Sequence, residues 1–300
     1  MPHTYTSVNE YLQKRFGEKI YKLSLNAGMT CPNRDGFLGS GGCFFCSQGG
    51  SGDFACGPVL GLSCTKEDIV SQIEEAKKLV KQKTKGSRYI AYFQAFTNTY
   101  APIDYLRKVF YAAIEHPDIA ILSVATRCDC LDENVIKLLK ELNSIKPVWV
   151  EMGMQSCHDS TLKAMNCCYT FEQFAKSTHL LSENGIDVIA HVILGLPGES
   201  RQMMLESVRQ ACSLPISGIK LQLLHVLKNT RLARMYEKDP FDIMSMDQYC
   251  DLIVECLDII PENIIVHRLT GDGPRKLLIA PMWSLDKKKV LNTLNKLIRA

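Results

Sequence analysis

The stretch Cys31-Pro-Asn-Arg-Asp-Gly-Phe-Leu-Gly-Ser-Gly-Gly-Cys43-Phe-Phe-Cys46 places three cysteines in a glycine-rich loop, directly after a run, 21–27, that is typical of a β-strand. In such loops backbone N–H groups can point toward the sulfide of an iron–sulfur cluster, and glycine allows the positive φ angles that this wrapping requires. Cys43 and Cys46 are spaced to bind neighbouring metal positions, and eleven residues separate Cys31 from Cys43. No fourth ligand is evident, so a [4Fe–4S] cluster on these thiolates would keep one iron open to an outside molecule.

A zinc site is the alternative interpretation of the same cysteines. A Cys-x-x-Cys pair with other cysteines nearby is often a zinc knuckle, and Cys56 or Cys64 could complete it. The loop alone leaves both interpretations open.

The composition sets the class of protein that we expect. Three hundred residues with 46% apolar content fit one large α/β barrel or two small domains, and the net charge of +3 does not require a nucleic-acid partner. Thirteen cysteines, a start (Met1-Pro-His) unlike a signal peptide, and no run of about 20 apolar residues lead us to expect a cytoplasmic protein that does not enter a membrane.

Strand-like and helix-like runs alternate along most of the chain. Thr65-Lys-Glu-Asp68 resembles a capping box, and apolar residues at helical spacing follow it. Strands are expected at 21–27, 88–95, 119–125, 148–154, 188–194 and 218–224, and helices at 7–16, 65–85, 103–115, 132–142, 171–184, 201–212, 245–260 and 284–299.

This alternation predicts parallel strands joined by right-handed crossovers. A closed barrel needs eight strand–helix units and six are clear, so the sequence predicts a partial (β/α)6 barrel resembling a TIM barrel, an α/β fold. We expect the barrel over residues 1–230 and a small C-terminal extension over 231–300, packed on the barrel. The run 263–269 fits either a further strand of the sheet or a C-terminal cap.

Unusual polar segments follow each predicted strand. In parallel α/β folds the carboxyl ends of the strands face one mouth, so these segments are expected to share a pocket. They are the cysteine loop, Gln94-Ala-Phe-Thr-Asn98, Thr126-Arg-Cys-Asp-Cys130, Glu151-Met-Gly-Met-Gln155, His191-Val-Ile-Leu-Gly-Leu-Pro-Gly-Glu199 and His225-Val-Leu-Lys228.

With these motifs in this order, the chain resembles radical S-adenosylmethionine (SAM) enzymes of the YtqA/YhcC type, which are related to the elongator catalytic subunit and more distantly to oxygen-independent coproporphyrinogen oxidase. The resemblance extends from Asn26-Ala-Gly-Met-Thr-Cys31 to His267-Arg-Leu-Thr-Gly-Asp272. The long gap after Cys31 departs from the three-residue gap of most of the superfamily but matches this branch. The resemblance implies a [4Fe–4S] cluster on Cys31, Cys43 and Cys46, with SAM as the second cofactor.

The resemblance also implies roles in SAM binding. The adenine would lie against Phe45 and against the segment from Gly195 to Pro197. The segment from Gln94 to Asn98 would take the place of the amine-binding motif. The ribose would contact Glu151 and Gln155, and His191 stands where relatives carry an acidic residue. Each residue also has an ordinary structural interpretation. Gln155 would cap a loop, His191 and Phe45 would be core residues, and Gly195-Leu-Pro-Gly198 would be a turn before a helix.

One motif departs from the family pattern. Relatives usually carry Asn-Arg-Gly-His before the helix that follows the fourth strand, and that arginine is expected to bind the SAM carboxylate; this chain has Asn166-Cys-Cys-Tyr169. Arg127, at the end of the third strand, is the cation that we expect to replace it. Cys128 stands where relatives usually have proline.

The resemblance implies reductive cleavage of SAM, followed by radical modification of a substrate. Relatedness to the elongator subunit points to the side chain of a tRNA wobble uridine, with electrons from a one-electron donor such as a flavodoxin or ferredoxin. Basic residues near the sixth strand and in the last helix favour tRNA only weakly, because such runs are usually solvated helix faces. A non-catalytic iron–sulfur or zinc-binding protein is the alternative, because the family arginine is missing.

Overall fold

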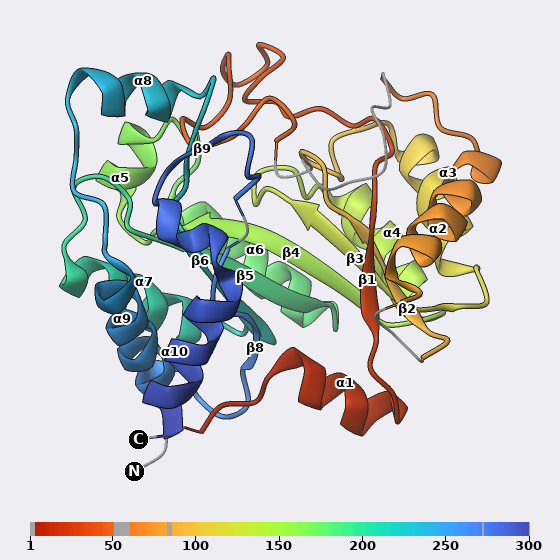
Figure 1. Cartoon of the computed structure of the whole chain (residues 1–300). Helices are drawn as coiled ribbons and strands as arrows, with labels where there is room; N and C mark the ends of the chain where they lie inside the picture. Colours follow the sequence, from red (N-terminus) through yellow and green to blue (C-terminus); the bar gives the residue numbers. More distant parts are fainter. Residues whose placement is uncertain (1–3, 51–60, 83–85, 272, 300) are drawn as a thin grey trace.

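The computed structural model describes residues 4–50, 61–82, 86–271 and 273–299. Its centre is a curled sheet of seven parallel strands, ordered β1-β2-β3-β4-β5-β6-β8. The strands are β1 Tyr21–Leu25, β2 Tyr89–Phe93, β3 Ile119–Thr126, β4 Val148–Gln155, β5 Asp187–Leu194, β6 Gly218–Leu223 and β8 Ile265–Arg268. Figure 1 shows the sheet with helices around its outer side. The predicted partial α/β barrel is confirmed.

The crossover helices follow the predicted alternation. They are α2 Lys66–Val80, α3 Ile103–Ile114, α4 Glu133–Asn143, α6 Phe171–Glu183 and α7 Arg201–Cys212, with the short α5 Asp159–Ala164 before α6. The predicted capping box is present, because Thr65 accepts from the Asp68 N–H and Asp68 accepts from the Thr65 N–H. The helix that follows it ends at Val80, before the predicted end at 85.

The C-terminal part contributes a strand to the main sheet. After β6 come β7 Val226–Leu227, α8 Arg231–Lys238 and α9 Met246–Ile259, and β8 then pairs in parallel with β6. Of the two interpretations of 263–269, a further strand is therefore the correct one. The chain ends with β9 Leu278–Ala280, which pairs with β7, the 3-10 helix η1 Met282–Leu285, and α10 Lys287–Arg299, which packs on α9.

The barrel has an apolar floor. Helix α1, Val8–Phe16, lies at the end of the sheet opposite the cysteine loop (Figure 1). Its Leu12 packs in a small core with the inward-facing residues Ile90, Trp149 and Ile189. A neighbouring segment also joins the far edge of the sheet, because Thr6 accepts a hydrogen bond from the Val266 N–H at 2.9 Å. The floor leaves the carboxyl ends of the strands as the open end of the barrel.

Candidate functional site

A cavity of about 640 Å³ fills the barrel interior and opens at the carboxyl ends of the strands. Its lining includes side chains from all seven strands of the main sheet together with the cysteine loop. Nine of the residues predicted for the site line it: Cys31, Cys43, Phe45, Cys46, Gln94, Arg127, Glu151, Gln155 and His191. The expectation that the polar segments meet in one pocket therefore agrees with the structure for most of these residues.

The cysteine loop is held by its own backbone and by Asn33. The Cys46 N–H donates to the Cys43 carbonyl at 3.0 Å, and the Gly42 N–H donates to the Asn33 carbonyl at 2.7 Å. Gly42 has a φ of +78°, and a Cβ on this residue would lie 2.8 Å from the Arg34 guanidinium. The turn before Cys43 therefore requires glycine, as expected for a loop that wraps a ligand.

The three sulfurs do not all lie as close together as the ligands of one metal ion do, although Cys43 and Cys46 are within hydrogen-bond distance of each other. Thiolates at 2.3 Å from one zinc lie only about 3.8 Å apart in a tetrahedral site. In the described part of the chain, Cys31, Cys43 and Cys46 do not form a group whose sulfurs all lie within 4.8 Å of one another. Ligands on separate corners of a cubane are farther apart than ligands on one ion, so the spacing fits an iron–sulfur cluster better than zinc.

Of the two cysteines proposed to complete a zinc site, Cys64 does not support one. Cys64 is buried in the main core beneath α3, where its N–H donates to the Tyr105 hydroxyl at 3.0 Å, and it does not line the cavity. Cys56 lies outside the described residues. A third thiol, Cys167, does lie close to the loop and donates to Cys43.

Hydrogen bonds from Cys167 and Cys46 lower the pKa of Cys43 well below its ordinary value, and Arg127 and Asn33 lower it further against the opposing effect of burial. Thiolate is the form of cysteine that binds metal. The same hydrogen bonds raise the pKa of Cys46 and Cys167, so Cys43 is the first of these three thiols to ionise.

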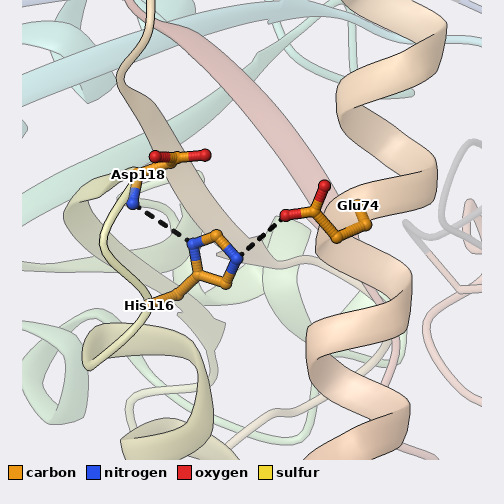
Figure 2. Close-up of side chains that lie close together, drawn as sticks. All are labelled: Glu74, His116 and Asp118. Carbon is orange, nitrogen blue, oxygen red and sulfur yellow. Dashed lines mark hydrogen bonds and ion pairs between the residues drawn. The ribbon is translucent and has the colours of Figure 1, made fainter.

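A second group of metal-type side chains lies on the outer surface and is neutralised. Figure 2 shows Glu74 of α2 beside His116 and Asp118, with His116 Nε2 3.1 Å from a Glu74 oxygen. The Lys77 ammonium binds both carboxylates, at 2.8 Å from Glu74 and 2.5 Å from Asp118. The group is therefore an ion-pair cluster that links α2 to the start of β3.

The buried carboxylate of Glu151 lies at the centre of a group of ionisable side chains in the barrel interior, which we call the charged layer. Its other members are Lys22, Tyr92, His191, Lys220 and Arg268. The Glu151 side chain has no solvent exposure, and it forms ion pairs with Lys22 of β1 and Lys220 of β6. It also accepts from Ser123 at 2.7 Å and lies 3.1 Å from His191 Nε2. Burial alone would raise the pKa of Glu151, but the two lysines and His191 hold it well below its usual range. The partner that a buried carboxylate requires is thus a set of cations from across the barrel.

The other groups of this layer respond to the same charges. Burial and Lys220 lower the pKa of His191 to about 4, against the opposing effect of Glu151, so the imidazole is neutral at pH 7. Burial, together with Glu151, raises the pKa of Tyr92. The Tyr92 ring lies 4.6 Å from the Lys22 ammonium and 4.9 Å from that of Lys220, so it contacts both cations through its face.

Arg127 lies beside the cysteine loop and is partly neutralised. Its Nε and Nη2 donate to the two oxygens of Asp129 at 2.8 and 2.6 Å, and its guanidinium lies 4.9 Å from the Tyr169 ring centroid. Nη1 makes no hydrogen bond within the described residues and remains available to a ligand in the cavity.

Gln94 and Gln155 present amides to the cavity. Gln94 accepts a hydrogen bond from Ser24 at 2.9 Å. Gln155 has a φ of +65°, which is unusual for a residue other than glycine, and its amide makes no hydrogen bond within the described residues. It folds back over Gly153, where a Cβ would lie 2.3 Å from the amide nitrogen. The amide of Gln155 is thus free to meet a ligand and does not cap the loop.

Three predicted residues lie away from the main cavity. The Asn98 amide donates to the carbonyls of Phe93 and Ala125 at 3.0 and 2.9 Å and so ties the end of β2 to β3. Gly195 and Pro197 line a neighbouring cavity of about 720 Å³ that also involves Phe241 and Met244.

Several cavity residues were not predicted: Lys22, Tyr92, Lys220, Gln222 and Arg268. Lys220 is one of the basic residues near the sixth strand, for which a solvated face was the usual expectation, but it is buried inside the barrel. Polar residues alternate with apolar ones in Lys22-Leu-Ser24 and Lys220-Leu-Gln222, which is the pattern of side chains that point into a barrel. The same alternation, followed along every strand, points to Lys22 and Lys220 as inward-facing residues.

Comparisons with known proteins agree with this site. Residues 31–211 match the model of the Radical SAM superfamily, and residues 216–300 match that of the Radical_SAM C-terminal domain. The chain belongs to the radical SAM superfamily. It is 43% identical over 292 residues to the uncharacterized protein YtqA of Bacillus subtilis, an alignment that covers 97% of this chain and 88% of that protein. The resemblance to the YtqA/YhcC type is confirmed.

More distant radical SAM relatives match part of the chain or its fold. A tRNA uridine(34) acetyltransferase of Methanocaldococcus infernus is 25% identical over 161 residues, which is 53% of this chain and 30% of that protein. The solved structure of Methanocaldococcus infernus Elp3, lacking its N-terminus, superposes with a TM-score of 0.64 at 17% identity and covers 93% of this chain and 64% of that one. The latter likeness shows a shared fold. No described helix of this chain has the length and apolar character needed to cross a membrane.

Proposed function

We propose that this radical SAM protein cleaves SAM reductively at a [4Fe–4S] cluster held by Cys31, Cys43 and Cys46, and uses the 5′-deoxyadenosyl radical to modify the side chain of a tRNA uridine. The observation that carries the first part is the meeting of the thiols of Cys31, Cys43 and Cys46 with the polar ends of the strands around one cavity. The three cysteines would hold the cluster, whose chemistry would be to supply one electron, received from a donor such as a flavodoxin or ferredoxin, to the SAM sulfonium, so that its bond to C5′ breaks to give methionine and the radical that abstracts hydrogen from the substrate.

The protein's part is to bind, orient and enclose. Gln94 and Gln155 present amides that can exchange hydrogen bonds with the amine and hydroxyls of SAM, and Phe45, between two of the cysteines, offers a face for adenine. The α1 floor closes one end of the barrel, so water can reach a radical formed there only from the mouth.

Arg127 is the residue that we assign to the SAM carboxylate. The family arginine is replaced by Cys167, whose thiol contacts Cys43 and carries no positive charge. Arg127 lines the same cavity, and its Nη1 is left over from the pair with Asp129. One charge-assisted hydrogen bond from Nη1 would hold the carboxylate beside the cysteine loop.

A tRNA uridine is the substrate that the relatives favour, because one of them is named for acetylation of uridine 34 in tRNA. The rim of the cavity is compatible with a polyanion. Arg231 is exposed after β7, and its guanidinium lies 5.5 Å from the Phe44 ring of the cysteine loop. Lys228 and Arg234 are exposed nearby in the sequence.

Two neighbouring thiols, the cavity-lining Cys43 and the buried Cys167, provide a matched test of the cluster. We expect Cys43→Ala to lose cluster iron and 5′-deoxyadenosine formation with dithionite, because it removes a ligand. Cys167→Ala removes a thiol that contacts Cys43, and we expect it to keep both. Anaerobic reconstitution with iron and zinc analysis measures the first property, and chromatography of the products measures the second. A Cys43→Ala variant that still cleaves SAM, or wild-type protein that binds one zinc and no iron, would refute the proposal.

The substrate is tested separately, in cells. Modified tRNA nucleosides of a deletion strain are compared with those of strains complemented by wild-type protein or by Cys43→Ala. We expect one uridine derivative to disappear on deletion and to return with the wild type alone. An unchanged nucleoside profile would remove tRNA from the proposal and leave the radical chemistry standing.

A further inference from the structure

The charged layer holds more positive charge than its carboxylate can neutralise. Lys22, Lys220 and Arg268 line the cavity, and Glu151 is the one acidic residue among the described residues of its lining. Charges inside a protein are screened far less than charges in water, so an excess of cations in a barrel favours an anionic ligand.

The same surplus appears in the count of hydrogen-bond donors. An ammonium has three N–H donors, and Lys22 and Lys220 each use one on a Glu151 oxygen. That carboxylate also accepts from Ser123 and lies within hydrogen-bond distance of His191, so its oxygens are already in use. Both lysines line the cavity, so the donors that are not used on Glu151 or against the Tyr92 ring can reach a ligand there.

Arg268 adds a guanidinium that the described residues leave unpaired. Arg268 of β8 lies opposite Lys220 of β6 in the parallel pairing of the two strands. Its charge lowers the pKa of Lys220 further, in addition to the larger effect of burial. No hydrogen bond or ion pair joins its guanidinium to the part of the chain that the structure describes. A guanidinium presents up to five donors in a planar fork, the arrangement that matches a carboxylate or a phosphate.

The two lysines of the layer are attached deeper in the barrel than the cysteine loop, beside which the SAM carboxylate is expected. Lys22 lies three residues before the carboxyl end of β1, and Lys220 lies three residues before that of β6. At about 3.3 Å per residue, the Cα atoms of both lysines lie about 10 Å back along their strands from the end that carries the cysteine loop. A SAM carboxylate held at the mouth would not occupy them.

We propose that Lys22, Lys220 and Arg268 form a subsite for an acidic group of the substrate, a carboxylate or a phosphate. This rests on the proposed function, because it assumes that SAM occupies the mouth and the substrate the interior. Glu151 holds the lysines from behind, and the acidic group binds from the cavity side. The substrate would then enter with its anionic end first, which places the atoms nearer the mouth within reach of the radical.

Arg268→Gln tests the subsite without breaking a described ion pair. The binding of acetate, of inorganic phosphate and of neutral acetamide is measured by calorimetry on cluster-loaded protein, with SAM present and no reductant, so that the open iron is occupied. We expect acetate or phosphate to bind and acetamide not to bind. We expect Arg268→Gln to bind the anion about 10- to 100-fold more weakly, the equivalent of one charge-assisted hydrogen bond. Lys228→Gln, which removes an exposed cation near the rim, should bind like the wild type.

The outcomes separate the two proposals. Preference for acetate or for phosphate identifies the acidic group. Equal binding of acetate and acetamide, or unchanged anion affinity in Arg268→Gln, would overturn the subsite. The same preparations are assayed for 5′-deoxyadenosine with dithionite: cleavage without anion binding rejects the subsite alone, and anion binding without cleavage rejects the radical chemistry alone.

Discussion

Replacing Glu151 by glutamine should destabilise the protein strongly, although the two side chains have nearly the same shape. The carboxylate is fully buried and is bound by the ammonium groups of Lys22 and Lys220. Glutamine keeps the volume but leaves two cations without their counter-charge. Removing one partner of a buried ion pair typically costs about 3–5 kcal/mol.

The size of the effect on Tm follows from the length of the chain. With an unfolding entropy of about 2.1 cal/mol/K per residue, a loss of 3–5 kcal/mol lowers the Tm of a 300-residue protein by about 5–8 °C. Differential scanning calorimetry of the reduced, metal-free protein measures it. Glu141→Gln is the matched control, because Glu141 is 44% exposed and pairs with Arg107 on the surface. Its Tm should fall by no more than about 2 °C.

A double variant tests the cause. Lys220→Met in the Glu151→Gln background removes one of the stranded cations, so we expect the double variant to be more stable than Glu151→Gln alone, with a coupling of about 1–3 kcal/mol. A Tm of Glu151→Gln within 2 °C of the wild type, or strictly additive effects of the two substitutions, would show that the charged layer does not hold the barrel together as we argue.

Three further predictions concern other parts of the molecule. Gly218→Ala should lower Tm by about 2–5 °C, because its Cβ would lie 2.7 Å from the His267 ring, which packs against Trp149; an unchanged Tm would show that the ring can move aside. Lys77→Met should cost at most about 1 kcal/mol at neutral pH. Because Lys77 lowers the pKa of Asp118, that stability is present above the unfolded pKa of about 3.9 and is lost as the pH falls through the lower folded pKa. The difference between the wild type and Lys77→Met in urea denaturation should therefore vanish in acid, and a difference that grows in acid would contradict the assignment. If tRNA binds at the rim, Arg231→Gln should reduce the slope of log K against log salt by about 1, while the exposed Lys137→Gln on α4 should leave the slope unchanged; equal slopes for both variants would place the RNA elsewhere.

The sequence predicted the barrel well because its signals are local. Alternating periodicities locate the strands and helices, and the rule that parallel strands open at one end brings the segments after them together. Cys31, Cys43 and Gln155 were found in this way, since each lies at or after a strand end. The strand β8 stayed ambiguous because four residues, Ile265–Arg268, carry too little periodicity to separate a sheet strand from a cap.

The charged layer was harder to predict because its members pair across the barrel. Glu151 and Lys22 are 129 residues apart in the sequence, and the residues around either one do not predict their contact. Asn98 shows the opposite difficulty. It lies in a segment that resembles a cofactor motif, but its amide is used to join two strands. Proximity along the chain placed it near the site, and only its hydrogen bonds show which way it faces.

The segment that begins with Thr6 and continues into α1 has a mechanical consequence for the half-open barrel. It is bonded to β8 at one end, through the Val266 N–H, and runs directly into β1 at the other, so it spans the two sheet edges that do not pair with each other in the described structure. Such a brace fixes the width of the seam between those edges. At the floor end of the barrel, β1 and β8 are thus held at a set separation although they do not pair with each other.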